Sequence, residues 1–293
     1  MTAPTYLKSN QMTYQQLYRQ TKNTLLQAGI ESPAFDASCL IKLCFGIDRQ
    51  ALIMRGNETA PAESISRLQS LTERRARGEP LQYLLGSWEF MGRKFSVGPG
   101  VLIPREDTQV TVQETLRRLS PVACPRVADL CAGSGAIAVT LAKELPQSAV
   151  TALELSLKAF GYLKKNIRYN HAENVRTVCG DVFTAFRDFE RESFDAIVSN
   201  PPYIETKEIG TLQREIFYEP KMALDGGPDG LVFYRAIIRD WTPLLRRGGI
   251  MAFEVGEGQA PTVKLLLLEH GFSDIQFQKD IGGTNRCVSA IKI

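Results

Sequence analysis

The chain has 293 residues, of which 44% are hydrophobic and 23% are charged, and its formal net charge is +3. This length suits a large core and about two domains, and the composition excludes a disordered or fibrous protein. The small net charge does not by itself indicate nucleic-acid binding.

Residues 1–80 have the pattern of a small helical bundle. Thr13 followed by Gln16 is a capping-box pattern, and Pro33 and Pro61 stand where first-turn prolines begin further helices. No catalytic constellation appears in this segment. We therefore expect it to pack as a bundle or to hold a partner.

A basic run, Arg74, Arg75 and Arg77, falls in the last turn of the third predicted helix. Positive charge at a helix C-terminus suits the helix dipole, so a solvated helix end explains the run. A contact with RNA or with an acidic partner is the alternative.

Residues 81–104 alternate in polarity and contain several glycines, which predicts a β-hairpin linker. From residue 105 to residue 293 strands alternate with helices, which predicts an α/β domain with a mostly parallel sheet covered on both faces. The last two strands are too close in sequence for a crossover helix, so they should pair antiparallel. The predicted strands are 126–130, 149–153, 175–179, 194–199, 250–254, 273–278 and 287–293, and the predicted helices are 134–145, 158–170, 233–245 and 260–268.

A glycine pair follows the first of these strands and leads into an apolar helix. Such a turn lets the main chain approach a nucleoside-like ligand at the carboxyl ends of the strands, although an ordinary tight turn also uses glycine. The dinucleotide pattern Gly-x-Gly-x-x-Gly is not met, because Ala138 occupies the third glycine position. The candidate binding residues of this segment are Asp129, Cys131, Ala132, Gly133, Ser134 and Gly135.

Acids also follow the next two strands. Glu154 could accept both hydroxyls of a ribose, or it could serve only as a helix cap. Asp181 could accept from an adenine amine while Val182 covers the ring, or it could belong to an ordinary Gly-Asp turn. A cofactor with one adenosine and a short charged tail fits the ends of these three strands. We therefore predict S-adenosylmethionine as the cofactor, with Asp129 near its charged centre.

The tetrapeptide Asn200-Pro201-Pro202-Tyr203 follows the apolar run 194–199. Two prolines lock the backbone at the strand end and remove N–H donors, so carbonyl acceptors converge there. A strand-terminating turn is the plainer interpretation of Asn-Pro alone. The full tetrapeptide at a strand end favours a site for a planar NH₂ group.

These motifs resemble those of the HemK/PrmC family, the release-factor glutamine methyltransferases. The resemblance also includes the stretches 78–83, 101–105 and 219–231, and it covers nearly the whole chain. It implies a helical N-terminal domain that engages a release factor, and a Rossmann-like methyltransferase domain. It further implies methylation of the glutamine in the Gly-Gly-Gln tip of that factor. Cys131-Ala132 stands where the family usually has Gly-Thr.

The catalytic residues are expected to be Asn200, Pro201, Pro202 and Tyr203. We hypothesise that the Asn200 side-chain oxygen and the Pro201 main-chain carbonyl accept the two amide protons of the substrate glutamine. These bonds stabilise the charge that grows on nitrogen, so no strong base is required. Tyr203 should pack against the glutamine side chain.

Three other functions remain open on sequence grounds. A ribosomal-protein glutamine methyltransferase shares the tetrapeptide, and a DNA methyltransferase could hold the amine of a flipped base in the same corner. DNA ranks lower because the charge is nearly even. A protein that only senses the cofactor and binds the release factor or ribosome is the alternative from another class.

Six cysteines without a Cys-x-x-Cys pair and only two histidines argue against a metal centre or a disulfide framework. No run approaches the ~20 apolar residues that span a membrane, and the N-terminus has no signal-peptide pattern. We expect a cytoplasmic, monomeric enzyme with a release factor as partner and no direct contact with nucleic acid or membrane.

Overall fold

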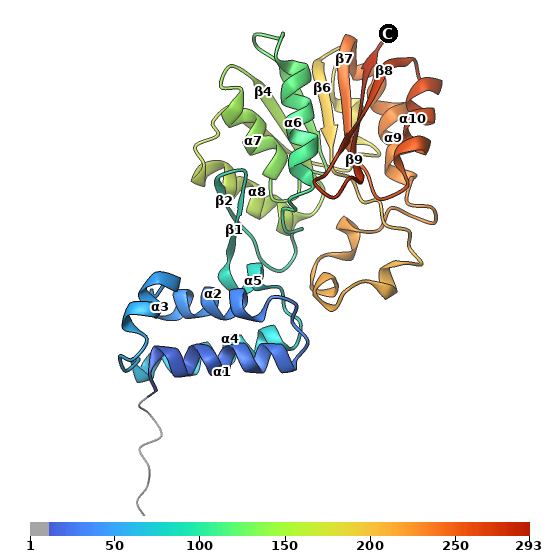
Figure 1. The fold of residues 1–293 in the computed structure, drawn as a ribbon. Coiled ribbons are helices and arrows are strands. Elements are labelled where there is room, and N and C mark those ends of the chain that lie inside the picture. The colour runs from blue at the N-terminus through green and yellow to red at the C-terminus, as the bar shows by residue number, and fades with distance from the viewer. Residues whose placement is uncertain (1–11) are drawn as a thin grey trace, which may run out of the picture. The chain divides into compact units, whose positions relative to one another are not determined.

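A computed structural model describes residues 12–293 (Figure 1). The chain divides into two compact units. One contains the residues up to Gly86 together with Arg214–Tyr218, and the other contains Ser87–Gln213 and Glu219–Ile293. The N-terminal unit is therefore built from two separate stretches of sequence.

The N-terminal unit is helical, as expected. The predicted capping box is present, with Thr13 Oγ1 accepting from the Gln16 N–H at 3.2 Å and Gln16 Oε1 accepting from the Thr13 N–H at 2.9 Å. Its core includes Leu17, Leu40 and Leu68. Its helices are α1 (Tyr14–Gln27), α2 (Pro33–Phe45), α3 (Arg49–Arg55), α4 (Ala62–Ala76) and α5 (Leu81–Leu85), with a 3₁₀ turn η3 (Arg214–Tyr218).

Arg75 is not at a solvated helix end, contrary to the expectation from the basic run. It is 4% exposed, and its guanidinium donates to Asp36 Oδ2 at 2.6 Å and to Glu215 Oε1 at 2.5 Å. Arg74 pairs with Glu79 instead. The basic run thus ties α4 to α2 and to the second stretch of the unit.

The second unit is mixed α/β. Its elements are β1 (Ser87–Phe90), β2 (Arg93–Ser96), α6 (Thr108–Leu119), β3 (Arg126–Leu130), α7 (Ala136–Glu144), β4 (Ala149–Glu154), α8 (Leu157–Tyr169), β5 (Val175–Cys179), η1 (Ala185–Asp188), β6 (Phe194–Ser199), η2 (Ile209–Thr211), η4 (Lys221–Ala223), α9 (Val232–Trp241), η5 (Thr242–Leu244), β7 (Leu245–Glu254), α10 (Ala260–Glu269), β8 (Phe272–Lys279) and β9 (Asn285–Lys292). The strands β1 and β2 form the predicted hairpin. It starts later than expected, because α5 occupies the first residues of the predicted linker and ends at Gly86 in a left-handed conformation.

Seven strands form one sheet in the order β5-β4-β3-β6-β7-β9-β8. The first five are parallel, and β9 pairs antiparallel with both β7 and β8, which confirms the expected antiparallel pair. In a parallel sheet all carboxyl ends point to one edge. The turns after β3, β4, β5 and β6 therefore meet along that edge.

Two apolar cores lie on opposite faces of this sheet. One contains buried side chains of α6, α7 and α8, and the other contains those of α9 and α10 (Figure 1). The strand β6 is buried along its whole length. This three-layer arrangement confirms the predicted α/β class and holds the carboxyl edge of the sheet rigid.

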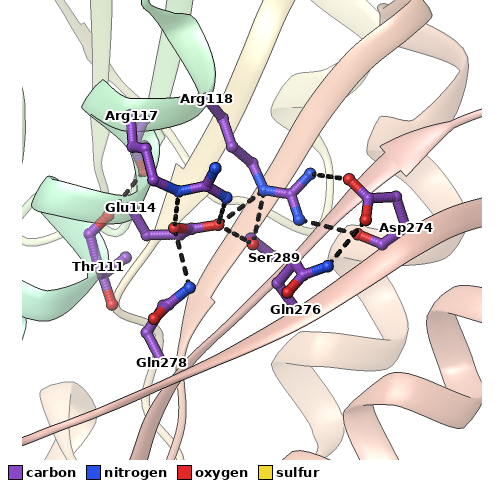
Figure 2. Close-up of polar contacts among 9 residues, drawn as sticks. Thr111, Glu114, Arg117, Arg118, Asp274, Gln276, Gln278 and Ser289 are labelled. Carbon is purple, nitrogen blue, oxygen red and sulfur yellow. Dashed lines mark hydrogen bonds and ion pairs between the residues drawn. The ribbon is translucent and has the colours of Figure 1, made fainter.

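The helix α6 was not predicted, and Figure 2 shows why its pattern is hard to recognise. Its buried face carries polar residues, which form an ion-paired network with β8 and β9. Glu114 accepts from Arg117, from Arg118 Nε at 2.7 Å, from Ser289 Oγ at 2.6 Å and from Gln278 Nε2 at 3.1 Å. Only Val112, Leu116 and Leu119 give this helix an apolar stripe, because polar side chains take up the rest of its buried face.

Candidate active site

The turn between β3 and α7 contains three residues in left-handed conformations. Cys131, Gly133 and Gly135 have φ angles of 61°, 56° and 84°. A Cβ on Gly135 would lie 2.5 Å from Leu163 Cδ1, so a side chain there would displace a fully buried leucine. A Cβ on Gly133 would meet no atom within 4 Å. The turn therefore packs against α8 at Gly135 and leaves its main chain open at Gly133.

Asp129 lies below this turn and is fully buried. Its Oδ2 accepts from the Ala138 N–H at 2.9 Å, which fixes the start of α7. Burial raises the pKa of Asp129 to about 8, and the nearby Glu154 adds to the rise. Asp129 is not among the residues that line the cavity described below, and its place near the charged centre of the cofactor stays a prediction.

Glu154 ends β4 and connects two turns. Its Oε2 accepts from the Gly133 N–H at 2.7 Å, and its Oε1 accepts from the Ser156 N–H at 2.7 Å. Burial raises the pKa of Glu154, while these main-chain bonds act in the opposite direction. Each carboxylate oxygen keeps a second lone pair, so Glu154 can still accept from the hydroxyls of a ligand.

The segment after β5 forms an apolar wall with one acid at its start. Asp181 Oδ1 accepts from the Phe183 N–H at 3.0 Å. The Phe183 ring lies 5.0 Å from that of Phe233, centroid to centroid, and Val182 is 5% exposed. Aromatic and branched side chains in this arrangement can cover one face of a planar ring.

The corner after β6 is made by residues 200–203. The Asn200 amide nitrogen donates to Thr108 Oγ1 at 3.3 Å, which leaves the Asn200 side-chain oxygen as an acceptor for a ligand. The Tyr203 hydroxyl donates to Glu254 Oε1 at 3.4 Å, and burial raises the pKa of Tyr203. The Tyr203 hydroxyl thus points toward β7, and packing of its ring against the substrate stays a prediction.

One cavity brings the ends of β3, β4, β5 and β6 together. The predicted residues that line it are Cys131, Ala132, Gly133, Ser134, Glu154, Asp181, Val182, Asn200 and Pro202. The other predicted residues, Asp129, Gly135, Pro201 and Tyr203, are not among the lining residues. The glycine turn and the proline corner thus face the same space.

Sequence reasoning missed several lining residues, among them Thr108, Leu155, Met222 and Phe233. Met222 lies in an irregular segment with 3₁₀ turns, where no periodicity marks a position as buried or functional. Thr108 begins the unpredicted helix α6. A threonine at a helix start is usually a cap, so nothing local identified it as part of the site.

Glu219 fastens two loops that form part of the cavity wall. It is 5% exposed, it accepts from the Ile103 N–H at 2.9 Å, and it pairs with Arg105. Ile103, Arg105 and the neighbouring Pro220 all line the cavity. The stretches 101–105 and 219–231, which carried part of the family resemblance, therefore meet at the site.

Two kinds of feature are absent from the described part of the chain. Within residues 12–293, no group of three or more His, Cys, Asp or Glu side chains is arranged to hold a metal ion. No helix in the same range combines the length and the apolar character needed to cross a membrane.

Solved structures share this fold. A methyltransferase from Pyrococcus furiosus matches with a TM-score of 0.51 at 19% identity, covering 75% of this chain and 98% of that one. The catalytic domain of hMettl16, solved with an RNA hairpin, matches with a TM-score of 0.56 at 15% identity, covering 78% of this chain and 82% of that one. Residues 110–237 match the family model "Methyltransferase small domain". The fold and the cavity at its carboxyl edge define a Rossmann-like methyltransferase.

Sequence comparisons identify the family of methyltransferases to which the chain belongs. Residues 16–86 match the family model "PrmC N-terminal domain". A release factor glutamine methyltransferase from Geobacter sulfurreducens is 41% identical over 269 residues, covering 92% of this chain and 93% of the relative. One from Moorella thermoacetica is 38% identical over 283 residues, covering 96% and 99%. The chain belongs to the release factor glutamine methyltransferase family.

Proposed function

We propose that this protein transfers a methyl group from S-adenosylmethionine to the side-chain amide nitrogen of the glutamine in the Gly-Gly-Gln motif of peptide chain release factors. The observation that carries the proposal is the single cavity lined both by the glycine turn with Glu154 and by Asn200 with Pro202. Family membership supports the choice of substrate. We further propose that the enzyme is monomeric and acts in the cytoplasm, where release factors meet the ribosome.

The residues of the cavity fit the cofactor. Gly133 leaves open space at the turn, and Glu154 offers carboxylate lone pairs to the two ribose hydroxyls. Asp181 would accept from the adenine amine, with Val182 and Phe183 against the ring. When bound, S-adenosylmethionine supplies a methyl group activated by its sulfonium.

The corner recognises the substrate amide. An amide nitrogen is a poor nucleophile because its lone pair is delocalised, so the enzyme gains most by fixing the nitrogen in one orientation. The Asn200 side-chain oxygen accepts one amide proton and the Pro201 main-chain carbonyl accepts the other. These acceptors also stabilise the positive charge that grows on the nitrogen during transfer. The proton is then lost to water, and no strong base is needed.

We assign capture of the release factor to the N-terminal bundle, residues 1–80, and methyl transfer to residues 105–293, with 81–104 as the linker. The match of residues 16–86 to the PrmC N-terminal domain supports this division. The compact unit also includes residues 214–218, so the division by sequence is not complete.

Labelled S-adenosylmethionine tests the proposal. The full-length protein would be mixed, in separate reactions, with a release factor, a ribosomal protein and DNA, and the label would be located by mass spectrometry. We expect label on the Gly-Gly-Gln glutamine and none on a release factor in which that glutamine is alanine. Label only on the ribosomal protein or on DNA would contradict the proposal, and binding of S-adenosylmethionine without transfer would indicate a sensor.

A further inference from the structure

The wall of the cavity carries two carboxylates and one guanidinium. Glu154 ends β4 and Asp181 follows β5, at the end where the proposed function places the adenosine. Arg105 is the one basic side chain among the lining residues, all of which belong to the described range 12–293. The proposed chemistry does not use this arginine.

Arg105 belongs to the side of the cavity that the corner at residues 200–203 forms. Burial and the charge of Glu254 raise the pKa of Tyr203, and the charges of Arg286 and Arg105 lower it. This influence places the Arg105 charge near the last residue of the corner. Arg105 also stands just before α6, whose first residue lines the cavity. The cation is therefore near the place of methyl transfer, whereas both acids are at the adenosine end.

A buried glutamate holds the Arg105 guanidinium and leaves part of it available. The side chain of Glu219 is 1% exposed and accepts from Arg105 Nη2, whereas the side chain of Arg105 is 41% exposed. Glu219 also accepts from the Ile103 N–H at 2.9 Å, so the pair is fixed to the loop that carries the arginine. A guanidinium has five N–H donors. It can therefore bind a second carboxylate while it stays paired with Glu219.

S-adenosylmethionine carries a carboxylate at the end of its methionine tail. A carboxylate needs a partner in a cavity that is lined mostly by apolar side chains. In the glycine turn, the N–H groups of residues 132, 133 and 135 already donate to acceptors of the protein. Hydroxyl groups of the wall, such as that of Thr108, can donate but bring no positive charge. Arg105 offers both donors and charge.

We propose that Arg105 binds the carboxylate of the methionine tail of S-adenosylmethionine, with Glu219 holding the guanidinium in place. The inference rests on the proposed function, which supplies the cofactor, and it adds a residue that recognises the tail. The polar groups of the cavity then complement the ligand along its length, with acceptors for the adenosine at one end and a cation for the carboxylate at the other. A cofactor bound at both ends has fewer positions open to its methyl group.

Binding of two ligands distinguishes this role from a structural one. S-adenosylhomocysteine has the tail carboxylate, and its decarboxylated analogue keeps the adenosine, the sulfur and the amine but lacks that group. Both would be titrated calorimetrically into the full-length protein without a release factor, so no methyl transfer is involved. We expect the wild type to bind S-adenosylhomocysteine about tenfold to a hundredfold more tightly, as hydrogen bonds to a charged group typically give.

Arg105→Met should remove this preference. Its affinity for S-adenosylhomocysteine should fall by about the same factor, while its affinity for the analogue should stay within about twofold of the wild-type value. Arg105→Lys keeps a positive charge but not the planar fork, so its loss should be intermediate. If Arg105→Met unfolds, the preference of the wild type and its reduction in Arg105→Lys decide between the two roles.

Arg117→Met is the matched control. Arg117 is likewise a partly exposed arginine that pairs with a glutamate whose side chain is 1% exposed, and it does not line the cavity. This variant should bind both ligands as the wild type does. A loss of preference in the control as well would mean that removal of any such arginine disturbs the cavity, which would overturn the inference.

Three other results would also overturn it. Equal losses of both ligands in Arg105→Met would show that the arginine only supports the wall through Glu219. Unchanged binding of both ligands would exclude contact with the tail, and a raised KM for the release factor would then assign Arg105 to the protein substrate. A wild type that binds both ligands equally well, or neither of them, would show that no carboxylate is recognised.

Failure of the proposed function gives a different result. The wild-type protein would then bind S-adenosylhomocysteine in preference to the analogue and yet place no methyl group on the release factor. In that case the role of Arg105 toward the cofactor would stand, and only the assignment of the substrate would fall.

Discussion

Glu114 and Glu254 are two glutamates of one unit whose side chains expose little surface and whose pKa values shift in opposite directions. Glu114 is 3% exposed and Glu254 is 1% exposed. The pKa of Glu114 is lowered to about 2, although burial acts to raise it, because Arg117, Ser289 and Arg118 donate to its carboxylate. The pKa of Glu254 is raised to about 7, since only weaker contacts offset its burial.

The difference shows that charged hydrogen-bond partners can outweigh the effect of burial on the pKa of a carboxyl. Glu114 is held by cations and serves to attach α6 to the sheet (Figure 2). Glu254 has no arginine hydrogen-bonded to it, and it lies next to the corner at residues 200–203, where Tyr203 donates to it. The carboxylate of Glu114 is suited to holding the fold, whereas that of Glu254 is destabilised by its burial.

The largest effect on stability is expected at the paired carboxyl. Glu114→Gln removes the charge opposite the buried Arg118 and should lower the free energy of unfolding by about 4 kcal/mol. Urea unfolding followed by circular dichroism measures it. Turnover below the unfolding transition should remain near that of the wild type. A stable variant with impaired turnover would contradict the structural role of Glu114.

Removing the side-chain acceptor of Asn200 should have a slightly smaller effect, confined to turnover. Asn200→Ala is expected to reduce kcat about a hundredfold, or ~3 kcal/mol of transition-state stabilisation, because one contact to the developing charge is lost. Steady-state transfer to the release factor measures it, with urea unfolding as the control for the fold. Normal turnover in this variant would show that the corner does not act on the amide.

The two carboxyls should give opposite slopes of stability against pH. A lowered pKa at Glu114 contributes stability that is present above about pH 4.5 and is lost as the pH falls toward 2. A raised pKa at Glu254 contributes stability that is present below about pH 4.5 and is lost as the pH rises through 7.

Glu254→Gln should therefore gain stability over the wild type between pH 5 and pH 8, by roughly 2 to 3 kcal/mol. Urea midpoints at several pH values measure this gain. Glu114→Gln, measured in parallel, should show no such gain over this range. Parallel curves for the wild type and Glu254→Gln would mean that Glu254 does not titrate there.

The smallest effect is expected from the exposed partner of Glu114. The side chain of Arg117 is 60% exposed, whereas that of Arg118 is 4% exposed. Arg117→Ala should cost within about 1 kcal/mol, because solvent screens the pair and Arg118 still neutralises the carboxylate. Urea unfolding measures it. A loss as large as that of Glu114→Gln would show that the exposed arginine holds the charge.

The sheet was largely predictable because its buried parallel strands are short apolar runs between turn signals, as in residues 194–199. The glycine turn and the proline corner could be predicted because glycine and proline restrict or permit backbone conformations regardless of distant contacts. The helix α6 was not, since its buried face includes Thr111, Glu114 and Arg118. A polar face becomes buried only through partners that lie far away in sequence.

The side-chain contacts behind the corner could not be predicted, for the same reason. Thr108 lies 92 residues from Asn200 in sequence, and Glu254 lies 51 residues from Tyr203. Each of these side chains has an ordinary local explanation, as a helix start or as a polar strand end. Only the packing of α6 and β7 beside β6 brings them together.

The N-terminal unit takes one of its ion-pair acceptors from a distant part of the chain. Arg75 binds Asp36 within the bundle and Glu215 in the stretch Arg214–Tyr218. A fragment that ends at Gly86 would keep the arginine and lose one of its two carboxylates. Anyone who exchanges this bundle between relatives must therefore graft both segments together.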